Sequence, residues 1–221
     1  GVNEAVTGRL RFGKRAFMTD GTTAAAEEVR MGDETSVYDV LATTLFRGLT
    51  AEVRGSLDLV SLPLRVPFCQ LPAFSCSSGS PVTVADYGTT LLAPGSYGSL
   101  VVGDGATLQL DPNASYTFCR VRIGRSSLVQ SSDRTTINVV GDFSMGAGSN
   151  LWTPSIVNDL PLILNVGGTK VRISQAAIVE AAITAPSAKL KIQREGELYG
   201  CFCTNMLVTD KQVLLECVDT T

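Results

Sequence analysis

Short stretches of alternating apolar and polar residues, each ending at a glycine, recur along the chain. In the repeated pattern, two apolar residues flank one variable position and a glycine follows at once; a small residue comes three positions later and an apolar residue two positions after that. Such alternation is typical of a short strand with one face inward. Six copies keep the glycine, at Gly13, Gly32, Gly48, Gly103, Gly124 and Gly146. Three degenerate copies have Ser174, Gln193 and Thr209 in its place.

The spacing of these corner positions predicts a β-solenoid. Consecutive corners are mostly 16 to 22 residues apart, a natural length for one coil. Glycine permits a corner with positive φ, and the small residue lets the chain pass close to the axis. We therefore expect one all-β domain over residues 1–221, a parallel β-helix-like solenoid of about nine or more short coils. The alternative, a β-sandwich, predicts hairpin turns at intervals of about 8–12 residues instead of one corner per coil.

One long interval, between Gly48 and Gly103, interrupts the repeat. Its residues 62–88 contain four prolines, two cysteines and a serine-rich run, a composition that indicates a loop. We predict that residues 62–88 form one inserted Pro/Cys/Ser-rich loop that a Cys69–Cys76 disulfide closes. The best helical stretch, from Thr22 to Val29, is too short to be stable alone.

The cysteines favour disulfides and hence an oxidising compartment. There are six of them and no histidine, which argues against a zinc site. Because residues 201 and 217 are one coil length apart, we expect Cys201 or Cys203 to lie near Cys217. The partner of Cys119 stays open, since six cysteines allow 15 connectivities. Buried free thiols are the alternative. The disulfide candidates are Cys69, Cys76, Cys119, Cys201, Cys203 and Cys217.

Composition excludes several functional classes. With 18 Lys and Arg against 21 Asp and Glu, the net charge of −3 predicts no basic field that would hold nucleic acid or an anionic membrane. The lack of histidine removes the usual general base and a common metal ligand, so we expect no cofactor and no metal. No run of eighteen apolar residues occurs, so we expect no transmembrane segment. Because the chain opens at Gly1, we expect a processed product or an excised segment.

Charged residues near the centre of the repeat raise the question of catalysis. β-Helical polysaccharide lyases and hydrolases need carboxylates, or carboxylates with a basic group, on adjacent coils. The candidates are Asp104, Asp111, Asp133 and Asp142, with Arg120, Arg122, Arg125 and Arg134. A charged surface that keeps the solenoid soluble is the favoured explanation, because charged surface residues normally have no catalytic role. We therefore expect no enzyme.

Several turn motifs resemble one protein family. The segments 92–98 (LAPGSYG), 103–108 (GDGATL) and 116–118 (YTF) are similar to motifs of an exported bacterial β-solenoid domain of surface and appendage proteins, the pilin-associated type. More distantly, the short coils resemble bactofilins, which polymerise end to end. The resemblance implies a structural role outside the cell or at its surface.

These observations together predict a structural, non-catalytic subunit of an extracellular bacterial filament, appendage or surface layer. An uncapped solenoid exposes strand edges and an apolar cross-section at both ends. We expect the coils at Leu10 and at Met206–Leu214 to be these ends, and the partners to be other copies of the chain or other envelope proteins, not nucleic acid. The alternative is a carbohydrate-binding or carbohydrate-degrading β-helix protein. A bactofilin-like cytoskeletal protein is a third hypothesis and requires free thiols.

Overall fold

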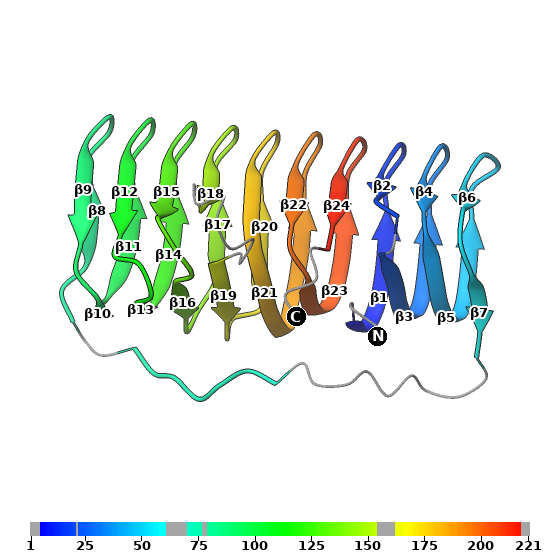
Figure 1. Ribbon diagram of the computed structural model, residues 1–221, viewed down its shortest axis with the longest axis horizontal. Coiled ribbons are helices and arrows are strands. Elements are labelled where there is room, and N and C mark those ends of the chain that lie inside the picture. Colours follow the sequence, from blue (N-terminus) through cyan, green and yellow to red (C-terminus); the bar gives the residue numbers. More distant parts are fainter. Residues whose placement is uncertain (1–4, 21, 61–69, 77–78, 154–161, 218–221) are drawn as a thin grey trace.

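The chain folds into a β-solenoid in which parallel strands stack into about ten coils (Figure 1). The computed structural model describes residues 5–20, 22–60, 70–76, 79–153 and 162–217, and these contain strands but no helix. The predicted all-β solenoid is thereby confirmed. Within the described residues no helix is of a length and hydrophobicity that could cross a membrane.

Each complete coil has three strand segments, which stack into three walls. In one coil they are β13 (Ser115–Phe118) in the first wall, β14 (Arg120–Ile123) in the second and β15 (Leu128–Ser131) in the third. Each pairs in parallel with its counterparts in the neighbouring coils. In several coils one long strand supplies both the first and the second wall, as β3 (Thr23–Met31) and β5 (Asp39–Arg47) do.

The remaining strands follow the same arrangement. In the first and second walls they are β1 (Ala5–Phe12), β7 (Leu57–Leu59), β8 (Val82–Val84), β10 (Gly95–Ser96), β11 (Ser99–Val102), β16 (Thr136–Val139), β17 (Phe143–Met145), β19 (Leu162–Val166), β20 (Lys170–Ile173) and β23 (Phe202–Thr209). In the third wall they are β2 (Phe17–Met18), β4 (Ser36–Val37), β6 (Glu52–Val53), β9 (Thr89–Leu92), β12 (Thr107–Leu110), β18 (Asn150–Trp152), β22 (Glu197–Tyr199) and β24 (Leu214–Glu216). Strand β21 (Ile178–Ile192) begins in the third wall and continues through the other two.

The apolar positions of the repeat form continuous buried rows inside the stack. In β14, Val121 and Ile123 are buried whereas Arg120 and Arg122 are exposed, as the alternation predicts. One row of the second wall passes through eight coils: Leu100, Val121, Phe143, Val171, Leu190, Leu207, Leu10 and Val29. Stacking therefore buries side chains that no single coil could bury. The stretch Thr22–Val29 lies mostly in β3 and is not helical.

The corner glycines serve close packing, and our prediction of positive φ at them is wrong. The positive φ falls two residues later, at Arg15, Glu34 and Ser126 and at Gly105 and Gly148. A Cβ built on Gly146 would lie 2.5 Å from the backbone of Gly124 in the preceding coil. The glycine thus lets successive corners stack, and the residue two positions later has the positive φ that makes the turn.

Two details of the repeat need correction. In the ninth copy the buried residues are Leu207, Val213 and Leu215, so its register is shifted by one residue from the Met206–Leu214 pattern. A tenth coil contains β8 and β9, and it begins inside the predicted loop 62–88. Alanine replaces the corner glycine there, at Ala85, which explains why the pattern missed it.

The order of coils in space differs from their order along the chain. Strand β1 pairs with β23 on one side and with β3 on the other, with Leu10 opposite Leu207. The coil nearest the N-terminus therefore stacks on the coil nearest the C-terminus, in the middle of the solenoid (Figure 1). Our prediction that these two coils are the ends is wrong. The ends are the coil of β6 and β7 and the coil of β8 and β9 (Figure 1).

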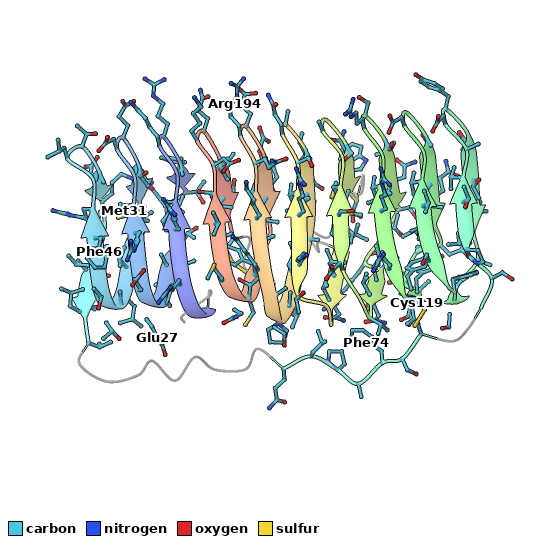
Figure 2. The ribbon with its side chains drawn as sticks, turned by 180° about the vertical axis from the view of Figure 1, so that it is seen from behind. Glu27, Met31, Phe46, Phe74, Cys119 and Arg194 are labelled. Carbon is cyan, nitrogen blue, oxygen red and sulfur yellow. A yellow bond between two sulfur atoms is a disulfide. The ribbon has the colours of Figure 1, made fainter. Side chains whose placement is uncertain are left out.

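Disulfides fasten the stack and the segment beside it. Cys76 is bonded to Cys119, with Cα atoms 5.0 Å apart, so the predicted Cys69–Cys76 pair is wrong; Cys69 itself lies outside the described residues. The bond joins the segment before β8 to a corner of the stack, near Phe74 (Figure 2). Cys201 is bonded to Cys217 with Cα atoms 4.5 Å apart, which confirms the expectation from coil spacing. Cys203 is also disulfide-bonded.

Candidate functional site: the two solenoid ends

The first end of the solenoid, which we name the Leu59 end, comprises residues 44–59. In the part of the chain that the structure describes, β6 pairs only with β4, and β7 pairs only with β5. The second half of β5, Thr44–Arg47, pairs with β3 on one side and with no strand on the other. Three backbone edges are therefore open at this end, one in each wall.

Apolar side chains of the Leu59 end continue the core rows, and no strand of the described residues stacks on them. Leu57 and Leu59 lie opposite the buried Val40 and Ala42, so they continue an inward-facing row. Leu59 is nevertheless 60% exposed. Leu49, at the corner, is fully exposed. This end therefore has the exposed apolar cross-section expected of an uncapped solenoid.

The second end, which we name the Val82 end, comprises residues 82–96. Within the described residues, β8 pairs only with β11, β9 only with β12 and β10 only with β13. Val82 and Val84 continue the inward row of Leu100 and Val102. The outward residues Tyr87 and Leu91 are exposed. This end also presents one open edge in each wall.

The two ends form complementary steps. At the Leu59 end the first wall extends one strand further than the second, because β7 covers only the first half of β5. At the Val82 end the second and third walls extend one strand further than the first, because β8 and β9 precede β10. A second copy stacked in the same direction would place β8 on Thr44–Arg47, β9 on β6 and β10 on β7. All strands would then stay parallel across the joint.

The inward rows meet across this joint, but not every pair is apolar. The register of the neighbouring coils places Leu45 opposite Val82, and Val53 opposite Thr90. Arg47 occupies the inward slot opposite Val84 and is exposed in the single chain, as its position outside the repeat pattern predicts. An inward-pointing charge on a terminal coil weakens edge-to-edge contact. Arg47 therefore limits the strength of the joint.

Two of the candidate carboxylates, Asp104 and Asp142, lie at different corners of the coil. Asp104 Oδ1 accepts a hydrogen bond from the backbone N–H of Arg125 at 2.7 Å, across neighbouring coils. Asp142 Oδ1 accepts bonds from the N–H groups of Thr169 and Lys170, both at 3.1 Å. Both carboxylates therefore cap corners of the following coil. Among the described residues no group of three or more Asp, Glu or Cys is placed to hold a metal ion.

The carboxylate of Asp133 has local partners as well, whereas Asp111 is held through its backbone. Asp133 accepts a hydrogen bond from the Asn113 side chain at 2.9 Å and one from the backbone N–H of Arg134 at 2.7 Å. These bonds lower the pKa of Asp133, the backbone bond having the larger effect. The backbone N–H of Asp111 donates to the hydroxyl of Tyr116 at 2.8 Å. Burial raises the pKa of that tyrosine.

Charge is divided between the walls of the solenoid. In the third wall Tyr199 donates a hydrogen bond to Glu197 at 2.7 Å. Burial, that bond and the nearby carboxylates of Glu216 and Glu180 raise the pKa of Tyr199 to about 12. From β14 to β3 the second wall carries mainly lysine and arginine on its outer face. The net charge of −3 does not show this arrangement, because net charge takes no account of where the charges lie.

The repeat pattern covers the second half of β5 and β6 at the Leu59 end, but it includes neither β7 nor the strands of the Val82 end. Gly88, three positions after Ala85, and the alternating Val82 and Val84 keep part of the repeat and could have revealed the tenth coil. No protein-family model matches the chain, and no curated protein or solved structure is significantly similar to it.

Proposed function

We propose that this chain is a structural subunit that assembles end to end into an extracellular filament, appendage or surface layer. The observation that carries the proposal is the complementary step at the two ends, where each open edge of one end faces an open edge of the other. Such a contact is heterologous, and a heterologous contact that does not close on itself generates a filament. Strand addition at open sheet edges is a common mode of recognition.

The disulfides support an extracellular place of action. Disulfides persist in oxidising environments such as the cell exterior, whereas reducing systems of the cytosol keep thiols free. Every cysteine in the described part of the chain is oxidised, including both partners of the Cys76–Cys119 and Cys201–Cys217 bonds. A location at the bacterial cell surface agrees with the turn motifs of residues 92–118, which resemble those of exported surface domains.

Arg47 gives the proposed joint a moderate strength. A guanidinium buried opposite Val84 would lose water without gaining a carboxylate partner from either inward row, and that desolvation opposes association. The apolar rows and the new strand pairings favour association. We therefore expect assembly that depends on protein concentration, not an irreversible aggregate.

The experiment compares two aspartate substitutions, one inside the joint and one outside it. Leu59→Asp puts a carboxylate into the joint, whereas Val101→Asp puts the same charge at an outward position of β11, one coil away from the Val82 end, that is 38% exposed. Sedimentation velocity and negative-stain electron microscopy should show linear particles for the native chain and for Val101→Asp. Leu59→Asp should be monomeric at the same concentrations.

Two results would contradict the proposal. One is a native chain that stays a compact monomer at high concentration. The other is equal loss of assembly in both variants, which would mean that the Leu59 end has no special part in the contact. Circular dichroism of each variant shows whether the solenoid itself stays folded.

The alternative, a carbohydrate-binding β-helix protein, gains support from a different part of the molecule, the outer face of the second wall. Its catalytic form would require carboxylates that act together. The hydrogen bonds of Asp104 and Asp142 use these two groups at corners instead.

A further inference from the structure

Half of the lysines and arginines of the chain lie on one flat surface, the outer face of the second wall. They occupy outward positions of β14, β20, β21, β1 and β3, and we name this surface the basic face. Its members are Arg120, Arg122, Lys170, Arg172, Lys189, Lys191, Arg9, Arg11 and Arg30. The row of paired positions from Arg122 to Arg30 crosses seven neighbouring strands, the first and the last included. The face therefore extends for about 30 Å at the usual strand spacing.

Like charges lie directly opposite one another within this face. Lys170 is the cross-strand neighbour of Lys189, and Arg172 is the neighbour of Lys191. Arg11 lies opposite Arg30 in the same way. Like charges in such positions destabilise a sheet. A surface that served only solubility would mix both signs instead, so the pattern indicates a function outside the fold.

Most of these cations have no carboxylate partner in the described structure. Glu28 forms ion pairs with Arg30 at 2.7 Å and with Arg9 at 3.9 Å, and the pKa of this carboxyl is lowered, above all by its hydrogen bond from Arg30. Lys191 pairs with Asp210 at 3.6 Å. No carboxylate of the described residues lies within 4.0 Å of the charged nitrogens of the other six: Arg11, Arg120, Arg122, Lys170, Arg172 and Lys189. All six side chains are exposed.

The basic face continues at one point over the adjoining corner. A hollow of about 610 Å³ there is lined by Arg11, Arg194 and Lys211, together with Gly13, Val208, Thr209 and Asp210. Arg194 projects from the corner loop, away from the strands (Figure 2). Cationic groups can therefore contact a ligand from the flat wall and from its rim.

We propose that the basic face binds a linear acidic polysaccharide that carries carboxylate or sulfate groups along an extended chain. The cations form a straight array, so a stiff linear polyanion can contact several of them at once. The arginine forks of Arg122 and Arg172 suit bidentate contact with carboxylate or sulfate oxygens. Binding of this kind would attach the assembly to an anionic glycan layer, and it does not depend on the end-to-end contact proposed above.

Other polyanions fit the face less well. Proteins that bind single-stranded nucleic acid add aromatic side chains on which the bases stack, whereas the strands from β14 to β3 place no aromatic residue on this face. The ring of Phe46 in the neighbouring β5 already contacts Arg30, whose guanidinium lies 4.7 Å from the ring centroid. The uncharged outward positions are occupied by Ser144, Met206 and Val208.

The test measures binding of polygalacturonate to the native chain at several salt concentrations. The double variant Lys170→Gln with Arg172→Gln removes two charges from the centre of the basic face. The matched control, Arg125→Gln with Arg134→Gln, makes the same change in net charge at exposed corner positions. We expect the first variant to bind about tenfold more weakly. The slope of log affinity against log salt should also become shallower by about 1.5. The control should bind within about twofold of the native chain, because exposed charges off the contact surface contribute little.

The comparison ligands are neutral dextran, a thirty-nucleotide oligo-dT and phosphatidylserine vesicles. Weaker binding of all three than of polygalacturonate supports the proposal. Tighter binding of the oligonucleotide or of the vesicles would overturn it in favour of nucleic acid or membrane. No binding of polygalacturonate at low salt, or an equal loss in both double variants, would overturn it as well.

Discussion

At the scale of single residues, the corners show why a small side chain recurs in the sequence. Gly146 stacks directly on Gly124 of the preceding coil, and the turn itself is made by Gly148, whose φ is +64°. Ser149, the small residue of the same copy, donates a hydrogen bond from its hydroxyl to the carbonyl of Gly146 at 2.7 Å. The glycine therefore sets the distance between coils, and the small residue fixes the corner from within.

This arrangement predicts that Gly146→Ala destabilises the solenoid. The added Cβ would meet backbone atoms of the preceding coil at 2.5 Å, and backbone cannot rotate away as a side chain can. We expect a loss of about 1–3 kcal/mol in the free energy of unfolding. The control is Gly95→Ala, where the new Cβ would lie at an ordinary 3.5 Å from the Tyr97 ring. Urea denaturation measures both, and equal losses would show that corner packing is not the cause.

At the scale of the coil, the local sequence predicts the strands well and their connections poorly. One copy of the pattern, such as Leu100–Leu108, contains a strand, a corner and the beginning of the next strand. Alternation and one glycine are therefore enough to find it. Three corners without glycine kept the rest of the pattern and were still found. The ninth copy was shifted because Met206 and Val208 are as apolar as the buried Leu207, and alternation alone cannot show which of two adjacent apolar rows faces inward.

Substitutions at two equivalent inward positions should change the stability very differently, because one position lies inside the stack and the other lies in a terminal coil. Ile123 is buried between coils on both sides, so Ile123→Asp would leave an unpaired carboxylate in the core and cost about 3–5 kcal/mol. Arg47 fills a similar slot in a terminal coil and is exposed. Arg47→Leu should therefore leave the free energy of unfolding nearly unchanged.

The same Arg47→Leu variant should assemble more strongly, because it removes the charge from the proposed joint. Thermal unfolding of the dilute chain measures the first effect, and light scattering at rising concentration measures the second. If Arg47→Leu unfolded the chain while Ile123→Asp did not, the assigned register of the inward rows would be wrong.

At the scale of the whole molecule, the spatial order of the coils could not be deduced from the sequence. Every coil offers its neighbour similar parallel edges and apolar rows, so local chemistry permits many stacking orders. Leu10 meets Leu207 at the seam much as Val121 meets Leu100 inside the stack. The Cys76–Cys119 bond was unpredictable for the same reason, since only the folded stack brings residues 43 positions apart together. The ends, and with them the candidate assembly site, depended on that order.

The seam between β1 and β23 allows a direct test of the coil order. Arg11 and Val208 lie opposite each other across it, both at outward positions. Neighbouring strands are about 4.8 Å apart, within the range of Cα separations that a disulfide spans. The double variant Arg11→Cys with Val208→Cys should therefore form a new disulfide within one chain. Non-reducing peptide mapping of the monomer, isolated at low concentration, would identify it.

The control for the seam places the second cysteine one strand further away. In Arg30→Cys with Val208→Cys, strand β1 lies between the two positions. Their separation of about 10 Å exceeds the reach of a disulfide. We expect no cross-link in that variant. If Arg11→Cys with Val208→Cys gave cross-links only between chains, the N-terminal coils would stack on the C-terminal coil of another copy. Each chain in a filament would then stack its N-terminal coils on the next chain, and β1 of one chain would not pair with β23 of the same chain.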